Sequence, residues 1–232
     1  MYKHLQASRL YEQIIRQIEA NIEDGTLSAG DKLPSERELS EQFGVSRTVV
    51  REAVKALREK GLVRIYPGKG TFITDNTSQV MRESIGLMVK IDQGKGLANL
   101  MQIRAMLEPE IAALAAQMAT PEDIKEMEQS IEAMEETLDD ADAFVEADQQ
   151  FHQSLAQATQ NELILRLINP IVELLREQRI RIFDARTGGP QRGQQHHKRI
   201  FAAIVNRDSD AARQAMIDHL EQVRADSDAL SE

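Results

Sequence analysis

The 232-residue sequence has no cysteine and no tryptophan, and aromatic residues make up only 4% of it. Without cysteine there is no disulfide framework, no thiolate nucleophile and no cysteine zinc site, so a metal ion would need histidine and carboxylate ligands. The shortage of aromatic side chains favours Leu, Ile, Ala and Met packing between helices over an aromatic-rich β-sandwich. A hydrophobic content of 41% with 28% charged residues is typical of a folded globular protein and excludes collagen-like and disordered classes.

Long apolar runs are also missing. No stretch approaches 18 consecutive apolar residues, and the first residues lack the apolar core of a signal peptide. We therefore expect a cytoplasmic protein that has no membrane partner.

The charge is distributed unevenly along the chain. Residues 1–75 carry 12 Lys and Arg against 11 Asp and Glu, whereas residues 76–232 carry 16 against 27. A net charge of −10 argues against nucleic-acid binding, but residues 31–74 alone hold nine basic and six acidic side chains. This asymmetry indicates two domains with different partners, at residues 1–74 and 79–232, joined by a short polar linker at residues 75–78.

The first domain begins with three predicted helices. Apolar residues recur at steps of three and four over residues 9–24, which is the period of an amphipathic helix. Ser35 and Glu38 form a capping box in front of a short second helix. Ser46 is placed to cap a third helix that runs to about Lys60. Two helices joined by a short turn are typical of a helix-turn-helix.

A β-hairpin is predicted after the third helix. The runs at residues 62–66 and 71–74 are rich in β-branched and aromatic residues, and they flank a glycine-containing turn at residues 67–70. The hairpin would serve as the wing of a winged helix-turn-helix.

One face of the third helix is cationic and the adjoining face is apolar. A helix of this kind can lie in the major groove of DNA, where arginine recognises guanine, so we assign Arg47 and Arg51 to base contacts. Four other residues suit phosphate or minor-groove contacts: Arg37, Ser46, Thr48 and Lys69. The alternative is a solvated charged face without a partner.

The first domain resembles the N-terminal domain of GntR-family bacterial transcription regulators. The resemblance covers about residues 9–74, and the segments that carry it are Pro34–Leu39, Gly44–Ala53, Leu57–Leu62 and Gly68–Phe72. It implies operator contacts for Arg37, Arg47 and Arg51. It also implies that the glycines of the wing, including Gly70, allow close approach to the minor groove.

No strand pattern follows the linker. We predict an antiparallel seven-helix bundle, so the fold class is mainly α with a small β-hairpin. The helices are expected at residues 79–92, 95–118, 121–139, 141–159, 161–185, 190–206 and 208–229.

Four of the five histidines lie in this second domain. Asp148 and His152 are four residues apart and share a helix face, while His197 and His219 lie in or beside apolar helical patterns. Three imidazoles and one carboxylate from separate helices can surround a divalent transition metal. A lone histidine on a half-apolar helix is more often an ordinary core or surface residue than a metal ligand. The neighbouring His196 is also an alternative to His197 as the ligand.

The second domain resembles the FCD ligand-binding domain of the FadR subfamily. The similarity lies in the segments Ile103–Ala116, Asp148–Leu163, His197–Ile204 and Met216–Leu220. It implies that Asp148, His152, His197 and His219 are the metal ligands, with zinc as the first choice and nickel or manganese as alternatives. It also implies a small carboxylate effector, such as a hydroxy acid or sugar acid, held near the metal. Arg104 matches a pocket arginine, although it can equally pair with an acidic neighbour.

These features together predict a transcription regulator and not an enzyme. We expect a homodimer that binds a pseudo-palindromic operator in double-stranded DNA and responds to the effector, as a repressor rather than an activator. Two alternatives are a metal-dependent hydrolase attached to a DNA-binding domain and a direct sensor of metal ions.

Overall fold

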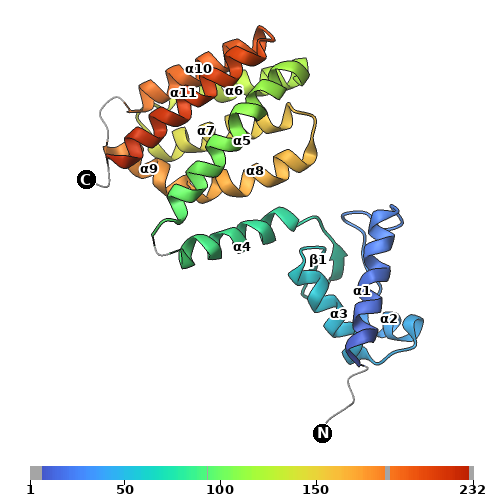
Figure 1. Ribbon diagram of the computed structural model, residues 1–232. Coiled ribbons are helices and arrows are strands. Elements are labelled where there is room, and N and C mark those ends of the chain that lie inside the picture. The colour runs from blue at the N-terminus through green and yellow to red at the C-terminus, as the bar shows by residue number, and fades with distance from the viewer. Residues whose placement is uncertain (1–6, 93, 186–188, 230–232) are drawn as a thin grey trace. The chain divides into compact units, whose positions relative to one another are not determined.

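The structure is a computed structural model that describes residues 7–92, 94–185 and 189–229. These residues form eleven helices and one two-stranded hairpin (Figure 1). The chain divides into two compact units, Met1–Glu83 and Ser84–Glu232. The prediction of a mainly α protein with a winged helix-turn-helix before a helical domain is confirmed.

Three helices and the hairpin make up the N-terminal unit. Its core is built around α3, whose inward residues Val50, Ala53 and Leu57 are buried together with Ile14 and Ile18 of α1. The elements are α1 (Ala7–Glu23), α2 (Glu36–Phe43), α3 (Arg47–Glu59), β1 (Val63–Tyr66) and β2 (Gly70–Ile73).

The caps that begin α2 and α3 are formed as predicted. The Ser35 hydroxyl accepts a hydrogen bond from the Glu38 backbone amide, and the Glu38 carboxylate accepts one from the Ser35 amide at 2.8 Å. Ser46 accepts from the Val49 amide at the start of α3. Each cap satisfies amides that the first helical turn leaves without partners, so both helix starts are determined locally.

The wing is an antiparallel hairpin in which Val63 pairs with Ile73 and Tyr66 pairs with Gly70. Because Gly70 already belongs to β2, the loop is one residue shorter than the four-residue turn expected from the sequence. Gly68 lies in this loop with φ of 73°, a conformation that glycine adopts without steric cost.

The segment expected to be a linker, residues 75–78, is not a separate segment. Helix α4 (Thr77–Ile91) begins within it, and the division between the two units falls inside α4. Backbone hydrogen bonds explain this, because the Asn76 amide donates to Gly61 O at 2.9 Å and Asn76 O accepts from the Val80 amide. The polar residues therefore start a helix that is attached to the end of α3.

The C-terminal unit is a helical bundle in which α11 packs on α5 and α10, and α6 packs on α7. Its core is aliphatic and includes Met127, Leu155, Ile200 and Met216 together with the ring of Phe151, as the composition favours. Besides the end of α4, the helices are α5 (Gly96–Met118), α6 (Pro121–Glu136), α7 (Ala141–Gln157), α8 (Glu162–Leu174), α9 (Arg176–Ala185), α10 (Gly189–Val205) and α11 (Ser209–Asp228).

The sequence predicts seven helices after the winged domain, whereas the described residues form eight, α4 to α11. The single helix expected at residues 161–185 is divided into α8 and α9 at Leu175. At this residue the backbone amide bonds Val172 O, three residues back, instead of continuing the four-residue ladder. Leu175 is buried, and no glycine or proline lies within four residues of it on either side.

Candidate metal centre and nucleic-acid interface

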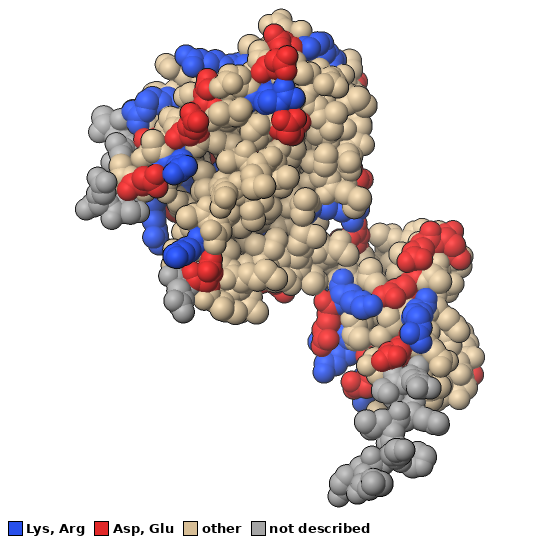
Figure 2. All heavy atoms as spheres, viewed as in Figure 1, with Lys and Arg blue, Asp and Glu red and all other residues tan. Residues whose placement is uncertain are grey.

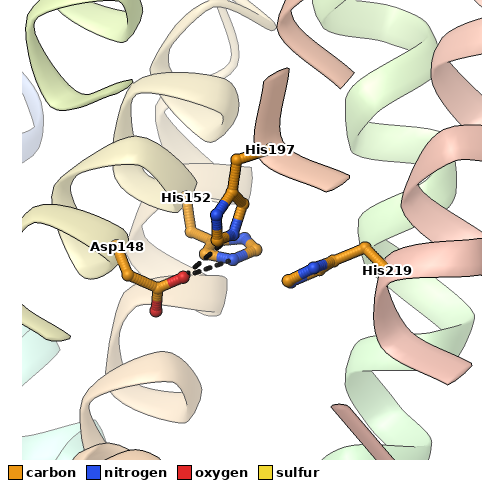
Figure 3. A group of neighbouring side chains, drawn as sticks. All are labelled: Asp148, His152, His197 and His219. Atoms are coloured by element: carbon orange, nitrogen blue, oxygen red, sulfur yellow. Dashed lines mark ion pairs between the residues drawn. The ribbon is translucent and has the colours of Figure 1, made fainter. Parts of the chain in front are cut away.

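Four side chains from three helices meet inside the C-terminal unit. Asp148 and His152 come from α7, His197 from α10 and His219 from α11 (Figure 3). All four are buried, and one potential ligand atom of each lies within 4.8 Å of the others. The structure thus brings together the four residues that the sequence analysis selected.

Helical spacing and aromatic packing hold the cluster in place. Asp148 and His152 are one turn apart on α7, so both side chains extend from the same face. The ring of Phe151 lies edge-on to His197, with ring centroids 5.2 Å apart, and His197 in turn lies 4.5 Å from His219. These contacts position the imidazoles before any ligand binds.

The distances within the cluster suit a single ion. His197 Nε2 is 3.0 Å and His152 Nε2 is 3.6 Å from Asp148 Oδ1. Two ligands of a tetrahedral zinc ion with bonds of about 2.0 Å lie about 3.3 Å apart, a value between these two. Both distances are short enough for the atoms to share one small cation, and 3.0 Å is also the length of a direct hydrogen bond between the His197 ring and the carboxylate.

Buried atoms without partners provide a second test of the fit. Within the described residues, Nδ1 of His197 and Nδ1 of His219 are buried and make no hydrogen bond, and His197 Nε2 meets only the Asp148 carboxylate. A buried polar atom left in this state costs about 1–3 kcal/mol. A divalent cation would take the lone pair of one nitrogen from each ring, so the residues present fit a metal ion.

The ionisation states of Asp148 and His219 also suit coordination. Burial opposes ionisation of Asp148, but Arg179 and the two histidines nearby hold the pKa of its carboxyl well below the usual range. Burial, together with His197 and His152, lowers the pKa of His219 well below its usual value. An ionised carboxylate and a neutral imidazole are the forms that bind metal.

Glu108 of α5 orients His152. Its Oε2 lies 2.8 Å from His152 Nδ1, which leaves Nε2 of the same ring facing Asp148. Burial lowers the pKa of His152, but the attraction of Glu108 outweighs it and the pKa is raised. A carboxylate behind a histidine is a common second layer of metal sites, and the sequence analysis did not assign this role to Glu108.

Arg104 is buried beside the cluster. Its guanidinium forms a two-pronged ion pair with Glu108, four residues further along α5, and Nη2 lies 3.4 Å from His152 Nε2. The acidic neighbour that the sequence left open as a partner is therefore Glu108. His196 lies outside the cluster, with its ring centroid 6.1 Å from that of His219.

A cavity of about 70 Å³ adjoins the cluster, and Arg104, Asp148, His197 and His219 contribute to its lining. A further lining residue, Arg179 of α9, was missed by the sequence analysis. Its Nη1 donates to Asp148 Oδ2 at 2.5 Å, while Nη2 is buried without a hydrogen-bond partner. Three arginines lie close together here, at positions 176, 179 and 181, so no signal in the sequence singles out Arg179.

The residues assigned to DNA contact lie on the N-terminal unit. Arg47, Thr48 and Arg51 are exposed in the first turns of α3, next to the Ser46 cap. Arg37 is exposed on α2 and Lys69 on the loop of the wing, whereas Gly70 is only partly exposed.

Two of these arginines already pair with carboxylates. Arg51 Nη2 lies 3.0 Å from Glu36 Oε2, and Arg37 Nη1 lies 3.0 Å from Glu41 Oε1. The Arg51 side chain remains 65% exposed, so its pair with Glu36 lies at the surface and is weak. In Figure 2, Lys and Arg side chains on the visible face of this unit lie beside Asp and Glu side chains. The sequence analysis did not identify Glu36 as a partner of Arg51.

The winged helix-turn-helix defines a DNA-binding protein, and its second unit holds a buried cluster beside a cavity. Within the described residues, no helix has both the length and the apolar character needed to cross a membrane.

Comparison with known proteins identifies the family. Residues 10–73 match the gntR family of bacterial regulatory proteins, and residues 99–222 match the FCD domain. The chain therefore belongs to the GntR family, with the domain combination of its FadR-like subfamily. It is a transcriptional regulator and not an enzyme, so the hydrolase alternative is excluded.

Relatives share nearly the full length of the chain. It is 35% identical over 209 residues to the HTH-type transcriptional regulator LutR of Bacillus subtilis (strain 168), which covers 87% of this chain and 94% of LutR. It is 31% identical over 229 residues to the HTH-type transcriptional repressor NanR of Klebsiella aerogenes, and the match covers 97% of this chain and 88% of NanR. The solved structure of Streptococcus agalactiae GntR has a TM-score of 0.74 at 26% identity, covering 93% of this chain and 99% of that one.

Proposed function

We propose that this protein is a homodimeric repressor that releases its operator when a small carboxylate effector binds beside a divalent transition metal. The observation that carries the proposal is the buried cluster of Asp148, His152, His197 and His219 next to a cavity, in a chain whose other unit is a winged helix-turn-helix. Repression is supported by the relative named as a repressor.

The metal and the effector are proposed to form one site. Zinc fits a set of three neutral imidazoles and one carboxylate, with nickel or manganese as alternatives. A zinc ion with four protein ligands can accept a fifth ligand. A carboxylate oxygen of the effector could therefore bind the ion beside the four side chains. Arg104 is already paired with Glu108. Arg179 also lines the cavity, and its buried Nη2, which has no hydrogen-bond partner among the described residues, favours an anionic ligand.

Exposed apolar side chains support the homodimer. Met106 on α5 is 68% exposed and Leu163 on α8 is 75% exposed, and Ile103 and Leu167 on the same helices are also exposed. In a monomer these side chains would remain in water. A two-fold dimer would also present two winged domains to the two half-sites of a pseudo-palindrome.

The DNA-binding part is tested with operator sequences selected from a random duplex library by the purified protein. Replacing Arg47 or Arg51 with Ala is expected to weaken binding to the selected sequence by about 1–3 kcal/mol each, because each removes a base contact. Arg16→Ala, an exposed arginine on α1, is the control and should bind normally. Normal binding by both Arg47→Ala and Arg51→Ala would contradict the assignment of α3 to the major groove.

The metal is tested by elemental analysis and the homodimer by light scattering. We expect about one zinc, nickel or manganese ion per chain and a mass twice that of one chain. His219→Ala should lose the ion, whereas His196→Ala should keep it. A metal-free protein whose thermal stability does not change on adding any of the three ions would contradict the metal site.

A further inference from the structure

We infer that the outward face of the wing binds the phosphate backbone of DNA through Lys32 and Arg64, which lie on either side of Phe72. This row of three side chains extends the DNA contact beyond α3 and the loop of the wing. The inference rests on the proposed operator binding, because it assigns a further surface to the same partner.

Strand pairing determines the row. Arg64 of β1 lies opposite Phe72 of β2, and an isolated bridge places Lys32 opposite Phe72 on the other edge of β2. Residues directly opposite each other in neighbouring strands extend to the same face of a sheet. Val63 and Ile73, the pair one position along, are buried, so the row lies on the face directed away from the core.

The Lys32 side chain is held against the wing. Its Nζ lies 5.8 Å from the centroid of the Phe72 ring, and Tyr66 packs edge-on to the same ring at 5.6 Å. A Cβ atom at Gly70 would lie 2.7 Å from Lys32 Cε, so the lysine stem occupies the space that this glycine leaves free. The stem is thus ordered before DNA binds, which lowers the entropy cost of the contact.

Both cations of the row lack an acidic partner. Lys32 and Arg64 are exposed, and within the part of the chain that the structure describes neither forms an ion pair. Three other cations of this unit each pair with a glutamate, namely Arg37, Arg51 and Lys60. The positive charge of the row is therefore available to an anionic partner.

Duplex DNA is the anionic partner that fits. The row lies within residues 10–73, the part of the chain that matches the DNA-binding family. Lysine, arginine and tyrosine commonly contact DNA phosphates, and such contacts carry no sequence information. Because neighbouring strands are about 4.8 Å apart, the backbones at Lys32 and Arg64 are about 10 Å apart, so the two cations contact separate phosphates.

The test measures how DNA affinity depends on salt. Full-length Lys32→Met and Arg64→Met are titrated with the selected operator and with a scrambled duplex over about 50–200 mM salt, by fluorescence anisotropy. Methionine keeps an unbranched stem and removes the charge. Each variant should lower the slope of log affinity against log salt by about 0.9, and the double variant by about 1.8. At about 0.1 M salt each should bind about eight-fold more weakly, to both duplexes alike.

Lys60→Met and Arg16→Met are the matched controls, because each removes one exposed cation of the same unit from outside the row. Both should keep the wild-type slope. Lys32→Arg and Arg64→Lys retain a cation at the row and should also keep it. Arg47→Ala gives the contrast of a base contact, which should weaken binding to the operator more than to the scrambled duplex. Thermal unfolding checks the fold of every variant.

The outcomes separate this inference from the proposed function. An unchanged slope in Lys32→Met or Arg64→Met, or a loss confined to the operator, would overturn the inference and leave operator binding through α3 standing. Lower thermal stability with an unchanged slope would also overturn it, because the row would then pack against another part of the chain. If the wild-type protein binds neither duplex, operator binding is contradicted and this inference fails with it.

Discussion

At the scale of single residues, buried charges shape the C-terminal unit. Arg104 and Glu108 are almost completely buried and form an ion pair within one helix turn of α5. Glu108 also contacts His152, so one carboxylate neutralises a guanidinium and orients a candidate metal ligand. Removing one partner of such a pair is costly, because the other charge is left in a medium of low polarity.

Glu108→Gln is therefore expected to lower the free energy of unfolding by about 3–5 kcal/mol, since it leaves the buried charge of Arg104 uncompensated. Urea denaturation followed by circular dichroism measures this loss. Glu110→Gln is the matched control, because Glu110 lies two residues away on α5 and pairs with the partly exposed Arg213. That surface pair should contribute about 1 kcal/mol or less. Losses of similar size in the two variants would show that burial of the Arg104 pair has no special role.

At the scale of elements, the junction between α3 and the hairpin depends on one glycine. Gly61 ends α3 with φ of 74°, in the left-handed region. A Cβ atom at this position would lie 2.7 Å from Asn76 O and 3.0 Å from Cγ2 of Val80. The glycine therefore permits both the backbone turn and the close approach of the segment that begins α4.

Gly61→Ala should destabilise the N-terminal unit more than Gly25→Ala. Gly25 also has a positive φ, of 78°, but nothing lies within 4 Å of its added Cβ. Both variants incur a backbone cost of about 1–2 kcal/mol, and Gly61→Ala adds an overpacking cost of about 1–3 kcal/mol. Chemical denaturation of the two variants side by side measures the difference. Equal stabilities would mean that the contact with Asn76 relaxes without cost.

At the scale of the whole molecule, the chain combines a locally basic DNA-binding unit with an acidic helical unit that holds the buried cluster. An effector bound in the second unit can change DNA affinity only through its different affinity for the DNA-bound and released states. The same coupling must act in both directions.

We therefore expect a binding acid to weaken operator affinity of the metal-loaded protein by about 5- to 150-fold, the usual range of allosteric coupling. Saturating operator DNA should weaken the binding of that acid by the same factor. Fluorescence anisotropy measures the first quantity and calorimetry the second. His219→Ala should bind operator but lose the response to the acid. Operator affinity that is unchanged at saturating acid would contradict a regulatory role for the cavity.

Much of the fold was predictable from the sequence because its signals are local. The caps at Ser35 and Ser46, the glycine at the end of α3 and the two β-branched runs of the wing each act within a few residues. The spacing of Asp148 and His152 placed two side chains on one helix face. The choice of His197 and His219 to join them depended on resemblance to a known family, because helical spacing does not bring separate helices together.

Only the tertiary structure decided which distant residues meet. The pairing of Glu36 with Arg51, and of Arg179 with Asp148, joins side chains 15 and 31 residues apart. The break at Leu175 has no glycine or proline to mark it, and the linker expected at residues 75–78 became the start of α4. Hydrogen bonds within a turn follow from the order of neighbouring residues, whereas contacts between helices depend on how all the apolar faces pack at once.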